Sequence, residues 1–179
     1  MELAESQEPR AGTPKVGISA CLLGQRVRYD GGHKLNVTVT DVLGKLVEWV
    51  PVCPEVELGL GTPREPIQLV RIGGGIRLVT VESRIDYTHA MNEWARVRLD
   101  DLAKADLSGY VLKSKSPSCG LDSANVYDGD WALDAKGRGL FAAALVDRFP
   151  GLPVEEEDRL QDPAVRRRFI ERVLAYRAS

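Results

Sequence analysis

The sequence predicts an α/β fold: a single domain with a mostly parallel, Rossmann-like sheet, helices on both faces, and an added C-terminal helix. Apolar runs alternate along the chain with segments of helical spacing, and parallel strands need crossovers long enough to hold a helix. At 179 residues the chain suits one domain with a substantial core. We expect a disordered leader at residues 1–14, a main domain at 15–152 and a C-terminal extension with a helix at 153–179.

The composition argues against several classes of protein. Lys and Arg number 24 against 26 Asp and Glu, a formal net charge of −2, so there is no overall basic footprint for nucleic acid. No apolar run approaches the roughly 20 residues of a membrane span. Residues 1–14 are polar and lack the apolar segment of a signal peptide, so we expect a cytoplasmic protein with no membrane partner. Three cysteines, an odd number, argue against a disulfide framework.

The first elements in chain order are a strand, a loop and a helix. Lys15–Cys21 begins as a short apolar strand, and Leu22-Leu23-Gly24 ends it. Gln25–Lys34 is a polar loop, and its Gly31-Gly32 pair permits positive φ and close approach of a ligand. The apolar residues of 36–47 recur at a spacing closer to helical than to alternating, which predicts a helix.

A second strand, a hairpin and a long helix follow. Leu46–Cys53 is rich in strand-forming residues and runs into Pro54, which cannot donate to a central ladder. After a loop rich in Gly and Pro, Ile67–Val81 alternates apolar and polar residues around three glycines and predicts a hairpin. Asp86 is a candidate N-cap for a helix that ends near Ala105.

The third strand contains Tyr110–Leu112 and ends in a turn of lysines and serines that leads to Cys119. Asp162-Pro163 starts a terminal helix that reaches about Tyr176. Between these lie a short strand and turn, a glycine-rich link, an apolar helix and an acidic stretch: Asn125–Gly129, Gly137–Gly139, Leu140–Phe149 and Pro153–Asp158.

All three cysteines follow strands. Cys21, Cys53 and Cys119 each lie at or just after the C-terminal end of a predicted strand. The handedness of crossovers brings these ends to one edge of a parallel sheet, where ligands bind in open α/β folds. If the three strands are neighbours, the three sulfurs converge. The lysines and serines around Cys119 would also favour a thiolate there.

The residues alone leave three interpretations of these cysteines open. They are ligands of an iron–sulfur cluster, ligands of zinc with His33 as the fourth, or separate buried side chains. Structural zinc usually takes closely spaced cysteine pairs, and the sequence has none. With three cysteine ligands, one iron of a four-iron cluster lacks a protein ligand and can accept a soft sulfur or act as a Lewis acid.

Three long motifs carry a resemblance to a known family. They are Ile18-Ser-Ala-Cys-Leu-Leu-Gly24 with Val27-Arg-Tyr-Asp-Gly31, Pro51-Val-Cys-Pro-Glu55 with Pro63-Arg-Glu-Pro66, and Leu112-Lys-Ser-Lys-Ser-Pro-Ser-Cys-Gly120. In this order, over about residues 16–152, they resemble the domain-of-unknown-function-523 family, associated with thiouracil desulfurases or desulfidases. The resemblance implies a [4Fe–4S] cluster on Cys21, Cys53 and Cys119, with an open iron that takes sulfur from a thiolated pyrimidine.

The tail carries a second resemblance. Val154–Leu160 and Phe169–Val173 are similar to the segment by which longer relatives, acting on 4-thiouridine in tRNA, pass into a second domain. This chain has Asp158 where that pattern has glycine, and it ends at Ser179 without the second domain. We therefore expect a free thionucleotide or thiobase as the substrate rather than tRNA.

The expected function is [4Fe–4S]-dependent desulfuration of 4-thiouridine monophosphate or thiouracil, which replaces C=S by C=O and releases sulfide. Attack by water needs a base and the leaving side an acid. Glu55, two residues after Cys53, is the expected base. Lys113 and Lys115 alternate along the chain, so only one faces inward, and Lys113 is the candidate. Ser116 completes the expected catalytic set.

Further residues are expected to hold the cluster and the substrate. Ser116, Ser118 and Gly120 would donate hydrogen bonds to cluster sulfurs or to the pyrimidine. A 5′-phosphate would gain charge-assisted hydrogen bonds from nearby cations, and Arg28 is the leading candidate because a guanidinium suits phosphate. The expected substrate-binding residues are Arg28, Tyr29, Lys34 and Arg64, with Arg26 as a further loop cation.

Two other classes of function stay open at this point. The same thiolates would suit a non-catalytic module that binds zinc or senses oxidants. An RNA-binding adaptor would use Arg166-Arg167-Arg168, and a tRNA 4-thiouridine desulfidase also stays open as an alternative. The same arginines also suit a solvated helix face, with the acidic residues 155–158 close in sequence.

Overall fold

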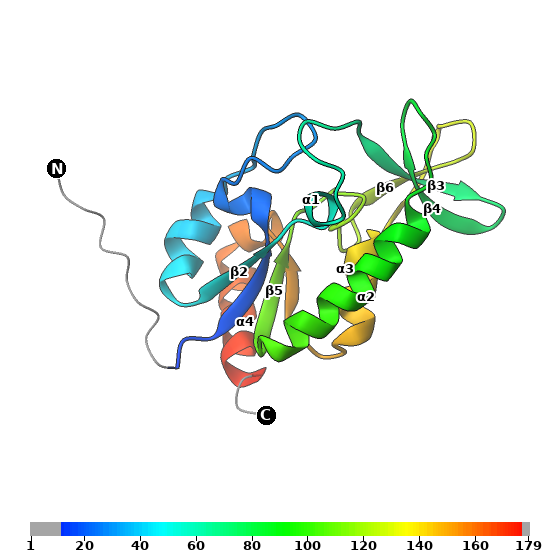
Figure 1. The fold of residues 1–179 in the computed structure, drawn as a ribbon. Helices are drawn as coiled ribbons and strands as arrows, with labels where there is room; N and C mark the ends of the chain where they lie inside the picture. Colours follow the sequence, from blue (N-terminus) through cyan, green and yellow to red (C-terminus); the bar gives the residue numbers. More distant parts are fainter. Residues whose placement is uncertain (1–11, 177–179) are drawn as a thin grey trace.

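Figure 1 shows the fold in a computed structural model, which describes residues 12–176. Within these residues a four-stranded parallel sheet has the strand order β2-β1-β5-β8. Its strands are β1 (Lys15–Ser19), β2 (Glu48–Val52), β5 (Leu107–Leu112) and β8 (Val154–Glu156). The predicted α/β class, with a parallel sheet and a C-terminal helix, is confirmed.

A second, mixed sheet has the order β4-β3-β6-β7. The predicted hairpin is β3 (Ile67–Ile72) with β4 (Gly75–Thr80). β6 (Ala124–Tyr127) runs parallel to β3, and β7 (Leu133–Gly137) runs antiparallel to β6. The sequence did not predict β7, because it is short, runs into a glycine-rich link and has largely exposed side chains, so its brief alternation marks no buried face.

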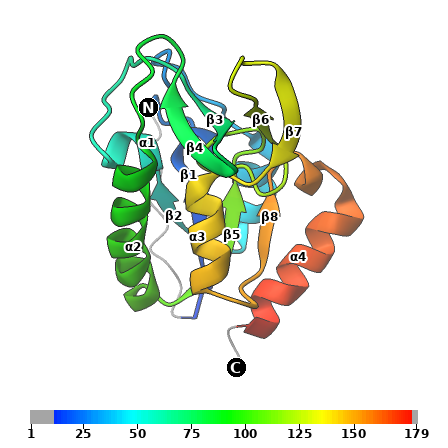
Figure 2. The same cartoon turned by 90° about the vertical axis from the view of Figure 1, so that its right-hand side faces the viewer.

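Helices cover both faces of the parallel sheet, as predicted (Figure 2). α2 (Thr88–Lys104) and α3 (Leu140–Arg148) pack on one face, where Tyr110 of β5 is fully buried. α4 (Pro163–Tyr176) packs on the other face, against Val111. Alternate residues of β5 therefore enter opposite cores. Because both faces of the strand are buried, its last residues form a continuous apolar run.

The predicted helix over residues 36–47 is confirmed only in part. The segment forms two short helical turns of other types, η2 (Thr38–Val42) and η3 (Leu43–Lys45). Four of the five residues of η2 are valine or threonine, whose branching at Cβ lowers their preference for an α-helix. Val39 and Leu43 enter the core beside α4, whereas the other apolar residues of the predicted pattern, Val37, Val42 and Leu46, are exposed, so the spacing identified the buried positions only in part.

β8 lies within the acidic stretch that gave no strand signal. It adds to the parallel sheet beside β5, and Glu156 at its end is buried. Charged residues are rarely buried unless they are paired, so a sequence pattern that ends in acidic residues does not indicate a strand. The segment after residue 152 thus contributes a strand to the parallel sheet.

At the N-terminal end, residues 1–11 of the expected leader lie outside the described residues. Pro14, the last residue of that expected leader, is buried, and its carbonyl accepts a hydrogen bond from the amide of Glu48 (2.9 Å). Within residues 12–176, each helix is too short or too polar to cross a membrane.

Candidate active site

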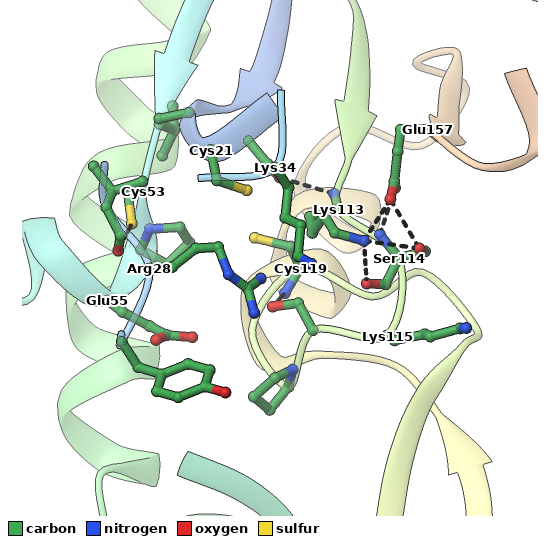
Figure 3. A pocket seen from close by; sticks show the side chains of 18 of the residues that line it. Cys21, Arg28, Lys34, Cys53, Glu55, Lys113, Ser114, Lys115, Cys119 and Glu157 are labelled. Carbon is green, nitrogen blue, oxygen red and sulfur yellow. Dashed lines mark hydrogen bonds and ion pairs between the residues drawn. The ribbon is translucent and has the colours of Figure 1, made fainter. Parts of the chain in front are cut away.

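A cavity of about 660 Å³ opens at the C-terminal ends of β1, β2 and β5. These three strands are neighbours in the sheet, which is the condition for their cysteines to converge. Cys21, Cys53 and Cys119 all line this cavity (Figure 3). Together with Glu55 and Lys113 they form what we call the inner wall, and Arg28, Tyr29 and Lys34 form the rim.

Each cysteine is placed by a short element at a strand exit. Cys21 lies in the single turn η1 (Ala20–Leu23), which Gly24 ends with a φ of 84°, a value that favours glycine. The carbonyl of Cys21 accepts a hydrogen bond from the amide of Lys34 (2.9 Å), which brings the end of the 25–34 loop to the cavity. Cys53 directly precedes the short helix α1 (Pro54–Glu57), and its amide donates to Glu57 Oε1 (3.3 Å).

Cys119 sits in a tight turn after β5. Its amide donates to Ser116 Oγ (3.0 Å), and the amide of Gly120 donates to the Ser116 carbonyl (2.8 Å). A Cβ atom at Gly120 would lie 2.8 Å from that carbonyl oxygen, so the turn has no room for a side chain there. The glycine after the cysteine is therefore explained by close backbone packing.

Burial controls the protonation of the three thiols. It raises the pKa of Cys21 to about 11, although Lys113 and Arg28 act to lower it. Burial also raises the pKa values of Cys53 and Cys119, and in Cys119 it outweighs a hydrogen bond with Ser19 that favours the thiolate. The expectation that the neighbours of Cys119 favour a thiolate is thus wrong for the metal-free chain. A metal or cluster has to displace these protons when it binds.

The donor set fits an iron–sulfur cluster better than zinc. Three thiols line one cavity, and thiolates are the ligands such clusters take. Among the described residues, no three His, Cys, Asp or Glu side chains close around a single ion position. His33 does not line the cavity, and its Nδ1 accepts a hydrogen bond from the amide of Leu35 (3.1 Å). Zinc therefore has no ready set of four ligands in this part of the chain.

Glu55 lines the cavity from α1 and is held on both of its oxygens. Oε2 accepts hydrogen bonds from Arg64 Nε (2.9 Å) and Nη2 (2.7 Å), and Oε1 accepts one from Ser118 Oγ (3.0 Å). The side chains of Glu55 and Arg64 are only 14% and 7% exposed. Arg64 also donates to the carbonyl of Gly61 (2.8 Å), so its guanidinium is largely engaged within the protein and orients Glu55.

Lys113 lines the cavity and is also fully engaged. Its ammonium group pairs with Glu157 and donates to the carbonyl and hydroxyl oxygens of Ser114 (3.0 Å each). An ammonium group has three N–H donors, so these contacts use all of them. Lys115 is exposed, and Figure 3 shows its side chain directed away from the cysteines. Lys113 is the lysine whose side chain faces the cysteines, as expected, but strand alternation is not the reason, because residues two apart on a strand share a face. Lys115 also lines the cavity and lies in a turn with a φ of 62°, which directs its side chain elsewhere.

The three predicted hydrogen-bond donors near Cys119 have different surroundings. Ser116 lines the cavity, and its hydroxyl oxygen accepts from the amides of Ser118 (3.2 Å) and Cys119 (3.0 Å), which leaves its proton for the cavity. Ser118 is buried and donates its hydroxyl proton to Glu55. Gly120 donates its amide to Ser116. Ser118 and Gly120 therefore act on the shape of the turn and on Glu55.

The rim carries cations with weaker internal contacts. The Arg28 side chain points into the cavity (Figure 3) and is 24% exposed. Its Nε lies 3.9 Å from Asp30 Oδ1, and its guanidinium carbon lies 5.5 Å from the centre of the Tyr29 ring. Lys34 lines the cavity and is exposed. Arg26 is exposed and does not line the cavity, so the loop supplies two cations to the rim and not three.

Sequence reasoning missed Glu157, which lines the cavity directly after the C-terminal end of β8. It is buried and accepts hydrogen bonds from the amide (2.6 Å) and hydroxyl (2.9 Å) of Ser114, besides its pairing with Lys113. It belongs to the acidic stretch that resembles the linker of longer relatives. That resemblance was the one feature of the sequence that could have pointed to Glu157 as a site residue. Nothing in the local sequence connects it with Lys113.

Comparisons with known proteins agree with this geometry. Residues 16–157 match the model of a family described as 2-thiouracil desulfurase. The chain is 32% identical over 155 residues to the uncharacterized protein YbbK of Bacillus subtilis (strain 168). The aligned region covers 81% of this chain and 97% of that protein. A solved structure of a [4Fe–4S]-dependent thiouracil desulfidase, TudS, matches with a TM-score of 0.68 and 37% identity, over 87% of this chain and 98% of that chain.

Proposed function

The chain belongs to the 2-thiouracil desulfurase family, and from that premise we propose that it desulfurates a thiolated pyrimidine nucleotide. The family predicted from the three motifs is confirmed, and so is the class of enzyme, a thiouracil desulfurase with a structural match to a [4Fe–4S]-dependent relative. The observation that carries the finer proposal is the cavity itself, which combines three thiols on its inner wall with two available cations on its rim.

We infer that Cys21, Cys53 and Cys119 would hold a [4Fe–4S] cluster. The solved relative is described as dependent on such a cluster, and the three thiols line the same cavity here. When bound, a cluster with three protein ligands supplies an iron that can take a soft sulfur and stabilise it as it leaves carbon.

Glu55 is suited to act as the base that takes a proton from the attacking water. Its carboxylate faces the cavity, and Arg64 and Ser118 fix its orientation from behind. A base held in this way does not have to reorganise during the reaction. Ser116 keeps a hydroxyl proton for the cavity and is suited to donate a hydrogen bond to an oxygen or nitrogen of the pyrimidine.

The rim supports a nucleotide over a free base. Lys113 uses its three donors within the protein, and the side chain of Lys115 points away from the cysteines (Figure 3), so contact with a phosphate falls to Arg28 and Lys34. A charge-assisted hydrogen bond to a phosphate contributes about 1.5–3 kcal/mol. A neutral thiobase gains nothing from these cations, whereas a 5′-phosphate does.

Anaerobic reconstitution with iron and sulfide, followed by assays with a panel of thiopyrimidines, tests this function. The panel contains 4-thiouridine monophosphate, 4-thiouridine, 4-thiouracil and 2-thiouracil, and the readout is sulfide released together with the oxo product. We expect the monophosphate to exceed the matching base by at least about tenfold in kcat/KM, which corresponds to 1.4 kcal/mol. A protein with full iron and sulfide content that turns over none of the four would overturn the proposal.

The arginines of α4 give the tRNA alternative little support. Arg166 donates to the carbonyls of Leu160 (2.8 Å) and Gln161 (3.3 Å), so its guanidinium stabilises the turn that precedes α4. Arg167 and Arg168 are exposed, as on an ordinary solvated face. No arginine of this cluster lines the cavity.

A further inference from the structure

Two adjacent carboxylates at the end of β8 are buried. Glu156 and Glu157 are each 6% exposed. A buried carboxylate is costly unless donors surround it, so such a pair should have specific partners. Every partner of these two carboxylates named below lies in residues 113–123, the segment that carries Ser116, Ser118 and Cys119; we call it the Cys119 loop.

Glu157 holds the start of the Cys119 loop. Its Oε2 accepts the amide of Ser114 (2.6 Å), and its Oε1 accepts the Ser114 hydroxyl (2.9 Å) and pairs with Lys113. Both oxygens are therefore in use. These contacts join residues 43 and 44 positions apart in the chain, so only the fold brings them together.

Glu156 holds the other end of the loop. Its Oε1 accepts the amide of Leu121 (2.7 Å) and the hydroxyl of Ser123. The Ser123 hydroxyl oxygen in turn accepts the amide of Lys115 (2.7 Å), which ties the two ends of the loop together. Successive side chains of an extended segment point to opposite sides, so neighbouring carboxylates can reach different ends of one loop.

We propose that Glu156 and Glu157 are positioning residues that clamp the Cys119 loop and so set the placement of the Cys119 thiol in the cavity. The inference rests on the proposed function only in treating Cys119 as a cluster ligand. The clamp itself is a property of the metal-free chain. The proposal gives the segment after residue 152 a role in the site: it supplies no cysteine, but its carboxylates hold the loop that carries one.

The test measures thiol labelling in the full-length, reduced, metal-free protein. Limited alkylation followed by peptide mass spectrometry gives separate rates for Cys119 and for Cys53, which serves as the internal reference. Loss of a buried partner should raise local opening of the loop, so Glu156→Ala and Glu157→Gln should each raise the Cys119-to-Cys53 ratio by roughly tenfold. The matched control is Glu155→Ala, because Glu155 pairs with Arg159 (3.6 Å) and accepts the amide of Glu156 (3.1 Å) but makes none of the contacts to the Cys119 loop described above.

The conservative variants separate a clamp from a general loss of stability. Both contacts of Glu156 go to one oxygen, so Glu156→Gln keeps an acceptor there and should restore a near wild-type ratio. Both oxygens of Glu157 accept, so Glu157→Gln should not be rescued in this way. If Glu156→Ala fails to fold, the difference in labelling ratio between Glu156→Gln and Glu157→Gln still tests the clamp.

Two results would overturn the clamp. One is an unchanged Cys119-to-Cys53 ratio in Glu157→Gln, which includes equal acceleration of both thiols, and the other is an equal ratio in both Gln variants. A second readout is the loss of visible cluster absorbance to a chelator after reconstitution, which should be faster in Glu157→Gln than in Glu155→Ala. The labelling uses neither metal nor substrate, so its outcome stands apart from any failure of desulfurase activity.

Discussion

The inner wall and the rim of the cavity hold their charges in different ways. On the inner wall, Glu55 pairs with Arg64 (2.7 Å) and Lys113 pairs with Glu157. On the rim, the contact of Arg28 with Asp30 is long (3.9 Å), and among residues 12–176 Lys34 forms no ion pair. The comparison teaches that side chains of the inner wall are oriented before a ligand arrives, whereas those of the rim keep charge available for one.

The largest effect should come from the thiols of the inner wall. Cys21→Ser, Cys53→Ser or Cys119→Ser should each abolish turnover, because each removes a soft ligand that a hydroxyl does not replace. The three side chains are small and lie at strand ends, so the fold should persist, as circular dichroism and thermal unfolding would show. Full activity in any one of these variants would remove that cysteine from the ligand set.

The next effect concerns the oriented carboxylate. Glu55→Gln should lower kcat by about 10²–10⁴-fold, the usual contribution of a general base, with a much smaller change in KM. Glu93→Gln is the matched control, because Glu93 lies on α2 in an exposed pair with Arg96 (3.4 Å). A Glu55→Gln enzyme with wild-type kcat would show that the inner wall orients Glu55 for structure and not for proton transfer.

The placement of the cysteines could be predicted from the sequence. Apolar runs end just before Cys21 and Cys53 and at Leu112, where the turn that leads to Cys119 begins, and the topology of parallel sheets brings such ends to one edge. Strand order had to be assumed, because no local pattern encodes which strands are neighbours. The structure supplies it as β2-β1-β5.

The partners of the charged groups could not be predicted. Lys113 was expected in the catalytic set. Its pairing with Glu157, 44 residues away, could not be foreseen, because that pairing depends on β8 and buried acidic residues give no strand signal. Arg64 was expected to bind substrate, although it holds Glu55. Sequence patterns report burial and periodicity well, but a charged side chain is assigned a role only when its neighbours are known.

The rim should control the choice between nucleotide and base. Arg28→Ala should lower kcat/KM for 4-thiouridine monophosphate about tenfold while sparing 4-thiouracil, because one charge-assisted contact is lost. Arg26→Ala is the matched control, since Arg26 belongs to the same loop and does not line the cavity. If wild-type protein uses both substrates equally well, the rim cations are ordinary loop charges.

The smallest effect should come from Lys34, and its dependence on salt sharpens the contrast within the rim. Lys34 is exposed, whereas the Arg28 side chain is 24% exposed, so solvent and ions screen the lysine more strongly. Lys34→Ala should raise KM for the monophosphate by about two- to fivefold at low ionic strength, the range of a partly screened charge. At roughly 0.5 M salt, where the screening length is only a few ångströms, this difference should vanish while the effect of Arg28→Ala persists in part. An effect of Lys34→Ala that is as large as that of Arg28→Ala and insensitive to salt would place the phosphate against Lys34 and reverse the order of the two rim cations.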